Sequence, residues 1–163
     1  FCSFSFSYLY FCFFILFLNI LLSYSKKTYN CFGDIMDCVK VKIEQHQIVD
    51  DVDDKIFFDG KAIFKNNYVQ VWLLEKNVFV NYLLVKKIDN KTFNLYFHQN
   101  KTQLLLSVGK PSAFNYQTNE GSLMLEATLI EGVLHNEQLY LKYQLSSNKK
   151  LISVNTLLIN SCK

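Results

Sequence analysis

Ten short runs of apolar or alternating residues, separated by turn-forming residues, constrain the fold of this chain most strongly. The runs are 39–47, 55–64, 68–75, 78–88, 92–98, 102–108, 113–118, 122–130, 137–145 and 151–159. Asn, Asp, Gly and Ser lie between most of them, and these residues favour reversals because they adopt left-handed backbone angles or bond their own backbone. No ten-residue window after Met36 carries the i, i+3, i+4, i+7 apolar spacing of an amphipathic helix. The sequence therefore predicts an all-β domain.

The links between the runs are short, so we expect sequential strands to pair antiparallel as a meander. About ten strands in one small domain must either close on themselves or leave edges that promote aggregation. A barrel of about 8–10 strands removes those edges. We therefore predict a meander closed into a barrel, with a two-sheet sandwich as the alternative.

Alternation assigns an inner face to three of the runs. The apolar alternate positions are Val39, Val41 and Ile43; Leu123, Leu125, Ala127 and Leu129; and Leu139, Leu141, Tyr143 and Leu145. Gln45 and Gln47 continue the first of these faces with amides. A barrel of this size has an interior that side chains fill or that holds one small ligand. Both outcomes stay open from the residues alone.

Residues 1–35 differ in composition from the rest of the chain. Their first 25 residues carry no charge, and an apolar run of this length reaches the ~20 residues that a membrane-spanning helix needs. A secretory signal is not favoured, because no basic residue precedes the run and no small-residue cleavage site follows it. The chain opens on Phe1, and its first methionine is Met36.

Two interpretations of residues 1–35 remain. All 17 basic residues are Lys, with 15 Phe but only 5 Gly and 1 Pro, a composition typical of an AT-rich genome whose noncoding DNA also translates into apolar residues. The segment is then an upstream translation artefact. Alternatively it is an N-terminal anchor, with Lys26 and Lys27 leaving the domain in the cytoplasm. In both cases we expect residues 36–163 to form a single β-domain.

The chemistry-bearing residues match no recognised catalytic or metal-binding pattern. Cys38 and Cys162 lie near the ends of the domain without a C-x-x-C pair, so we expect reduced thiols, with a disulfide between the terminal strands as the alternative. His46, His98 and His135 lie on separate segments, where we expect surface positions. No H-E-x-x-H, G-x-S-x-G or P-loop pattern occurs. We therefore expect no catalytic residue, no metal site and no cofactor.

The acidic residues and the overall charge also exclude some partners. Residues 50–54 read Asp-Asp-Val-Asp-Asp, and we predict a solvated loop there. A calcium loop counted from Asp51 fails, because Lys55 and Ile56 stand where an oxygen ligand and a Gly are needed. From Met36 onward, 15 Lys minus 13 acidic residues give a net charge of +2. This is far from a basic footprint, so a nucleic-acid partner is disfavoured.

Residues 116–128 and 139–145 resemble the YwiB-like β-barrel proteins, a bacterial family of unknown function. The family pattern is Tyr-x-Thr, a nearby Gly, an alternating strand that ends in Thr, and a strand with a central Tyr. The matching positions here are Tyr116, Thr118, Gly121, Thr128 and Tyr143. In order and spacing the resemblance covers about residues 39–160.

This chain departs from the family at one hairpin. His98 and Asn100 stand where members often carry an Arg followed by a Gly, so any ligand role of that Arg is lost or changed here. The resemblance implies a calycin-like (lipocalin-type) barrel and a bacterial cytoplasmic location. It implies no reaction.

We therefore expect a cytoplasmic, non-enzymatic barrel that binds a small apolar or amphipathic ligand in its interior. The candidate ligand-binding residues are Gln45, Tyr116, Thr118 and Tyr143, polar groups expected on or near the inner face. The alternative function is an interaction module that binds a protein or RNA through its outer surface. Contact with a membrane is expected only if residues 1–35 belong to the native protein, and no sequence feature specifies an oligomeric state.

Overall fold

The computed structural model describes residues 38–118 and 121–162, and the interpretations of residues 1–35 lie outside this part of the chain. Each of the ten predicted runs is a strand, and the described residues contain no helix. The strands are β1 (Cys38–Val49), β2 (Val52–Phe64), β3 (Tyr68–Glu75), β4 (Val78–Asp89), β5 (Thr92–Phe97), β6 (Thr102–Ser107), β7 (Ser112–Thr118), β8 (Gly121–His135), β9 (Gln138–Ser147) and β10 (Lys150–Ser161).

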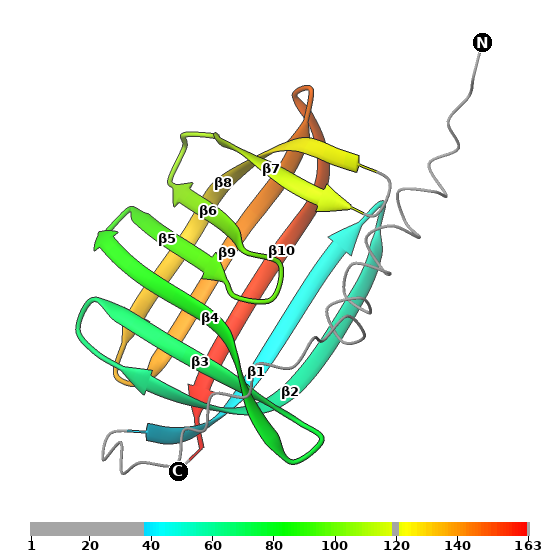
Figure 1. Ribbon diagram of the computed structural model, residues 1–163. Coiled ribbons are helices and arrows are strands. Elements are labelled where there is room, and N and C mark those ends of the chain that lie inside the picture. Colours follow the sequence, from blue (N-terminus) through cyan, green and yellow to red (C-terminus); the bar gives the residue numbers. More distant parts are fainter. Residues whose placement is uncertain (1–37, 119–120, 163) are drawn as a thin grey trace.

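The ten strands form one antiparallel sheet in the order β6-β5-β4-β3-β2-β1-β10-β9-β8-β7. The first and last strands pair with each other, from Val41 opposite Ser161 to Ile48 opposite Val154, so the sheet curls into a nearly closed barrel (Figure 1). The seam lies between β6 and β7, which do not pair, and beside it isolated bridges join Ser107 to Lys110 and Val108 to Leu129 of β8. The predicted meander closed into a barrel is confirmed, and the sandwich alternative is wrong.

The turn between β1 and β2 is shorter than predicted. Asp50 and Asp51 have φ angles of 46° and 65°, and Val49 pairs directly with Val52. Two consecutive positive φ angles make a tight hairpin turn whose twist matches that of the strands. The prediction of a loop over residues 50–54 was therefore wrong in extent, because its last three residues belong to β2.

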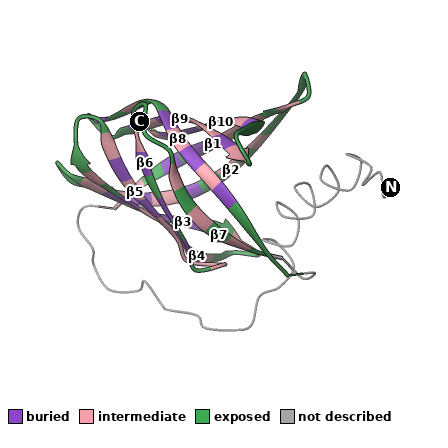
Figure 2. Cartoon of the chain, turned by 90° about the horizontal axis from the view of Figure 1, so that it is seen from above, coloured by how far each residue is buried: buried purple, intermediate pink, exposed green. Residues whose placement is uncertain are grey.

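The core is aliphatic and lies inside the barrel, where the burial colouring of Figure 2 alternates along the strands. The largest fully buried side chains are those of Phe93, Ile43, Leu83, Leu95, Leu106, Leu129, Leu139, Leu141, Ile159, Val41, Val69 and Val71. The predicted inner faces hold along β1 and β9 and for three of the four residues on β8. Leu123 is the exception, being 40% exposed near the open tip of the β7–β8 hairpin.

A close approach between β5 and β8 fills one part of the barrel. A Cβ placed on Gly132 of β8 would lie 2.6 Å from Cε2 of Phe93 and 3.1 Å from a methyl carbon of Leu141. The fully buried Phe93 ring from β5 therefore occupies the space that a side chain at position 132 would need. Glycine is required here because an aromatic ring from another strand packs directly on the backbone.

We expect Gly132→Ala to destabilise the domain by about 1–3 kcal/mol, because the added methyl group overpacks the core against Phe93. Combined with Phe93→Leu, the substitution should cost less than the sum of the two single effects, since Leu vacates the contested space. Urea unfolding monitored by circular dichroism measures both quantities. Glu131→Ala, at the exposed neighbouring position on the outer face of β8, is the control and should leave the stability nearly unchanged. Additive effects of Gly132→Ala and Phe93→Leu would contradict the packing argument.

Candidate functional site

The strand register identifies which side chains point into the barrel, because directly opposed residues share one face of a sheet. One inward row crosses β1, β10, β9 and β8, and its residues are Gln47, Asn155, Tyr143 and Leu129. The adjacent row consists of Gln45, Leu157, Leu141 and Gly132. Polar side chains are therefore neighbours on the inner face of three adjacent strands.

Many inward residues around this polar region keep partial solvent exposure. We call them the open half of the barrel: Gln45, Gln47, Ile56, Phe58, Phe97, Phe114, Tyr116 and Tyr143. By contrast, the inward residues Val41 and Ile43 on the same β1 strand are 1% and 0% exposed. The barrel thus has one densely packed half and one half whose inward aromatic and amide side chains are partly exposed, with Phe58, Phe97, Phe114 and Tyr143 packed against the core.

A β-bulge in β4 directs Tyr82 into the interior. Asn81 pairs with Trp72 and Leu83 pairs with Val71, so Tyr82 is an extra residue without a partner on β3. A bulge changes the direction of a side chain relative to strict alternation, and here both Tyr82 and Leu83 are buried. On the other side of β4, the Tyr82 carbonyl accepts a hydrogen bond of 2.9 Å from the backbone N–H of His98.

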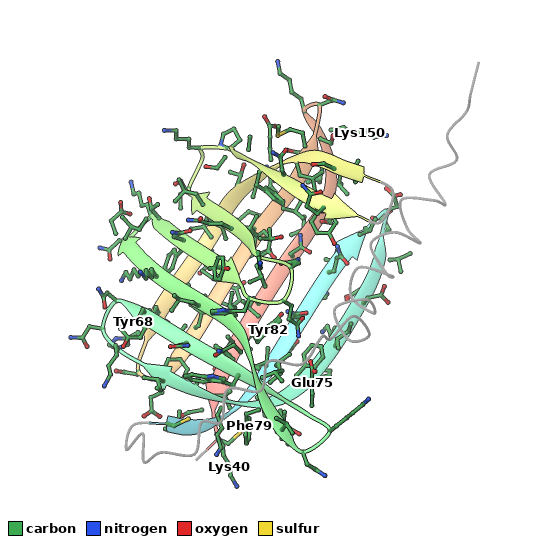
Figure 3. All side chains as sticks on the ribbon, in the orientation of Figure 1. Lys40, Tyr68, Glu75, Phe79, Tyr82 and Lys150 are labelled. Carbon is green, nitrogen blue, oxygen red and sulfur yellow. The ribbon has the colours of Figure 1, made fainter. Side chains whose placement is uncertain are left out.

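The Tyr82 side chain links opposite walls of the barrel. The side-chain amide of Gln45 on β1 donates a hydrogen bond to the hydroxyl oxygen of Tyr82 on β4. Figure 3 labels Tyr82 near the middle of the view. The Tyr82 ring also packs edge-to-face against Phe97 of β5, with 5.9 Å between ring centroids. Because the hydroxyl oxygen is the acceptor of the Gln45 bond, its own proton is available for a different acceptor.

Tyr82 and Tyr143 are held in their neutral forms. Burial raises the pKa of Tyr82, the nearby Tyr143 raises that pKa further, and the Gln45 hydrogen bond lowers it in part. Burial also raises the pKa of Tyr143 to about 12. No described side chain forms a hydrogen bond with the Tyr143 hydroxyl. We call Gln45, Tyr82 and Tyr143 the tyrosine cluster.

A second polar pair lies beside this cluster on β10. Asn155, 8% exposed, donates a hydrogen bond of 2.9 Å from Nδ2 to Oγ of Ser153, which is 1% exposed. Asn155 is directly opposite Tyr143 in the β9–β10 ladder. The site therefore offers amides and hydroxyls, and the residues that form it carry no formal charge. Such groups orient a neutral polar group rather than pair with an ion.

Two of the four predicted site residues join the tyrosine cluster. Gln45 bonds Tyr82, and Tyr143 lies close enough to Tyr82 to influence its ionisation. Tyr116 points inward on β7 opposite Leu123 and lies outside the cluster. Thr118 ends β7 opposite Gly121, and its side chain lies outside the described residues.

The sequence prediction missed Tyr82, Ser153 and Asn155. Tyr82 could not be assigned an inner position by alternation, because the bulge places consecutive residues on one face. Asn155 did carry a usable signal, since it continues the alternate positions of Leu157 and Ile159 along β10.

The histidines occupy three separate places, as predicted. His46 on the outer face of β1 pairs with Asp53 of β2, and His98 follows β5 with its ring edge-to-face against Tyr96. His135 is exposed at the end of β8. Over residues 38–118 and 121–162, no three His, Cys, Asp or Glu side chains are grouped as metal ligands.

Among the described residues, no helix is long and apolar enough to cross a membrane.

Comparison with solved structures identifies a similar fold. The structure of the ywiB protein from Bacillus subtilis superposes with a TM-score of 0.54 at 15% sequence identity, over 78% of this chain and 93% of that chain. The YwiB-like fold expected from residues 116–128 and 139–145 is thereby confirmed. At this identity the likeness concerns the fold alone. No family model and no curated protein sequence matches the chain.

We expect the stability of the domain to fall as the pH rises from 10 towards 12. The ordinary tyrosine pKa is 10.0, and burial raises that of Tyr143 to about 12. Below pH 10 both states keep the proton; above it, the unfolded chain ionises first and unfolding becomes favoured. Denaturant unfolding at several pH values measures this effect. The free energy of unfolding should fall less steeply between pH 10 and 12 for Tyr143→Phe than for the native chain.

The matched control for this experiment is Tyr140→Phe, on the outer face of the same strand. Tyr140→Phe preserves the Tyr143 hydroxyl. Its free energy of unfolding should therefore fall more between pH 10 and 12 than that of Tyr143→Phe. Equal declines in the two variants would show that the Tyr143 hydroxyl does not titrate as a buried group.

Proposed function

We propose that this barrel binds a small, uncharged amphipathic ligand in its open half. The observation that carries the proposal is the tyrosine cluster, a set of neutral hydrogen-bonding groups among partly exposed aromatic side chains on the inner face. Ligand sites of this kind are mostly apolar and use a few polar groups to fix orientation.

The hydroxyl groups favour a ligand with an oxygen acceptor. Tyr82 accepts from Gln45 and still has a proton to donate, while the Tyr143 hydroxyl lacks a partner among the described side chains. A carbonyl or hydroxyl oxygen of a ligand placed between the two tyrosines can accept a hydrogen bond from each hydroxyl.

The charge of the ligand follows from the same residues. A buried ion is very costly without a charged partner. Gln45, Tyr82, Tyr143, Ser153 and Asn155 are all neutral, and burial holds both tyrosines protonated. The cluster therefore favours an alcohol, ester, amide or ketone over a carboxylate or an amine.

The packed half limits the size of such a ligand. Phe93 lies against Gly132 and occupies the interior at that level. The apolar part of the ligand would contact Phe58, Phe97 and Phe114 of the open half, whose side chains are partly exposed. The ligand is thus a compact molecule that does not extend through the whole barrel.

We also propose a cytoplasmic location for the domain. Cys162, which follows β10, is an exposed free thiol. A free thiol suits a reducing compartment.

The alternative function, binding of a protein or RNA through the outer surface, has less support. The outer face of β1, β2 and β9 carries charges of both signs. The basic residues are Lys42, Lys55 and Lys142, and the acidic residues are Glu44 and Asp59. Mixed charge of this kind does not form the basic patch on which RNA binding depends.

A neutral fluorescent probe tests the ligand site. Nile red, which is apolar and carries a carbonyl oxygen, should bind the full chain, and Tyr143→Phe should weaken binding about tenfold through loss of one hydrogen bond in a desolvated site. A long-chain alcohol should displace the probe more effectively than the carboxylate of equal length.

Tyr140→Phe, which alters the outer face of the same strand, is the control and should bind Nile red like the native chain. Absence of saturable binding, or equal weakening by the two variants, would contradict the proposal. Native mass spectrometry of protein purified from its own host then gives the mass of the natural ligand.

A further inference from the structure

One half of β2 has an unpaired edge. On one side, all of β2 from Val52 to Ile63 pairs with β1. On the other side, β3 pairs only with residues 60–64, from Gly60 opposite Leu73 to Phe64 opposite Val69. None of the other described strands pairs with residues 52–59 on that side. Such an edge is a template for another strand.

The hairpin turn determines which backbone groups point to this edge. In a two-residue hairpin, the residues that flank the turn form a hydrogen-bonded pair, and here they are Val49 and Val52. Hydrogen-bonded pairs alternate along an antiparallel ladder, so the even-numbered residues of β2 bond β1. The N–H and C=O groups of Lys55 and Phe57 therefore point away from β1, and no described strand pairs with these two residues on that side. Asp59 points the same way, but its C=O group lies at the end of the β2–β3 ladder, beside the Gly60–Leu73 pair.

The outward side chains along this edge are self-complementary. Asp53, Lys55, Phe57, Asp59 and Lys61 lie on the outer face, and their charges read minus, plus, neutral, minus, plus. The order of charges inverts about Phe57. Phe57 itself is 65% exposed. Within the described residues, neither Lys55 nor Asp59 takes part in an ion pair.

From these observations we propose that two copies of this chain associate through β2, antiparallel and centred on Phe57. Each Lys55 then faces Asp59 of the other copy, and the two Phe57 rings face each other across the symmetry axis. The N–H and C=O groups of Lys55 and Phe57 and the N–H group of Asp59 form an intermolecular ladder. Pairing of β3 from Gly60 onward limits the overlap to residues 55–59.

Other registers are disfavoured by charge. Centring the pair on Ile56 places Asp53 opposite Asp59 and leaves Lys55 opposite Phe57. Like charges directly opposite each other destabilise an antiparallel pair. Charge therefore favours the Phe57-centred register over the Ile56-centred one, and this preference does not depend on whether the interior binds a ligand.

Sedimentation velocity of the full chain tests this association. The native chain should be a dimer at hundreds of micromolar, and Lys55→Asp and Asp59→Lys should each weaken dimerisation at least tenfold, because each places like charges opposite one another. An equimolar mixture of these two variants should dimerise again, since every cross-strand pair is then complementary. The double variant K55D/D59K should also dimerise alone.

Lys86→Asp, on the exposed outer face of β4, is the matched control and should leave the dimer intact. Circular dichroism of each variant verifies folding. The proposal is overturned if the native chain stays monomeric at these concentrations, or if mixing the two single variants fails to restore the dimer.

Discussion

The pairing of β1 with β10 is the constraint on which the rest of the barrel depends. Eight consecutive residue pairs join the ends of the chain, from Val41–Ser161 to Ile48–Val154, and bring the first and last strands into one ladder. Without it, the meander would be two separate sheets with four edges. With it, the inward side chains of β1, β9 and β10 form continuous rows, and Gln45, Tyr143 and Asn155 become neighbours although they are distant in sequence.

The tyrosine cluster depends on a second feature, the bulge in β4, which departs from the regular alternation of inward and outward side chains. Tyr82 enters the interior only because β4 carries one residue more than β3 opposes. A bulge leaves backbone groups unpaired in the ladder, yet the Tyr82 carbonyl accepts the N–H of His98 and its hydroxyl accepts from Gln45. These two hydrogen bonds compensate for the bulge, and they join β4 to the residue after β5 and to β1. A satisfied buried hydrogen bond favours one arrangement of the strands that it joins.

The strands and the barrel could be predicted from the sequence because alternation and turn residues act locally. Val41, Ile43, Leu139 and Leu141 are buried as their period indicates, and the Asp50–Asp51 reversal lies within the predicted acidic stretch. The site was harder to predict because it depends on contacts between distant strands. Gln45 and Tyr143 were found through their faces, whereas the partner that joins them, Tyr82, stands at an irregularity that no periodic pattern reveals.

The unpaired edge of β2 belongs to the same segment as part of the interior. None of the described strands pairs with residues 52–59 of β2 on one side, and the same segment contributes Ile56 and Phe58 to the open half. A lone edge strand of this length is an aggregation risk, which charged side chains reduce by repelling most other strands. On β2 the charges are ordered rather than uniform, so they oppose pairing in the Ile56-centred register while permitting the one centred on Phe57. On this strand the inward residues Ile56 and Phe58 alternate with outward residues of the edge. A second strand that pairs with the edge therefore also fixes the position of one wall of the open half.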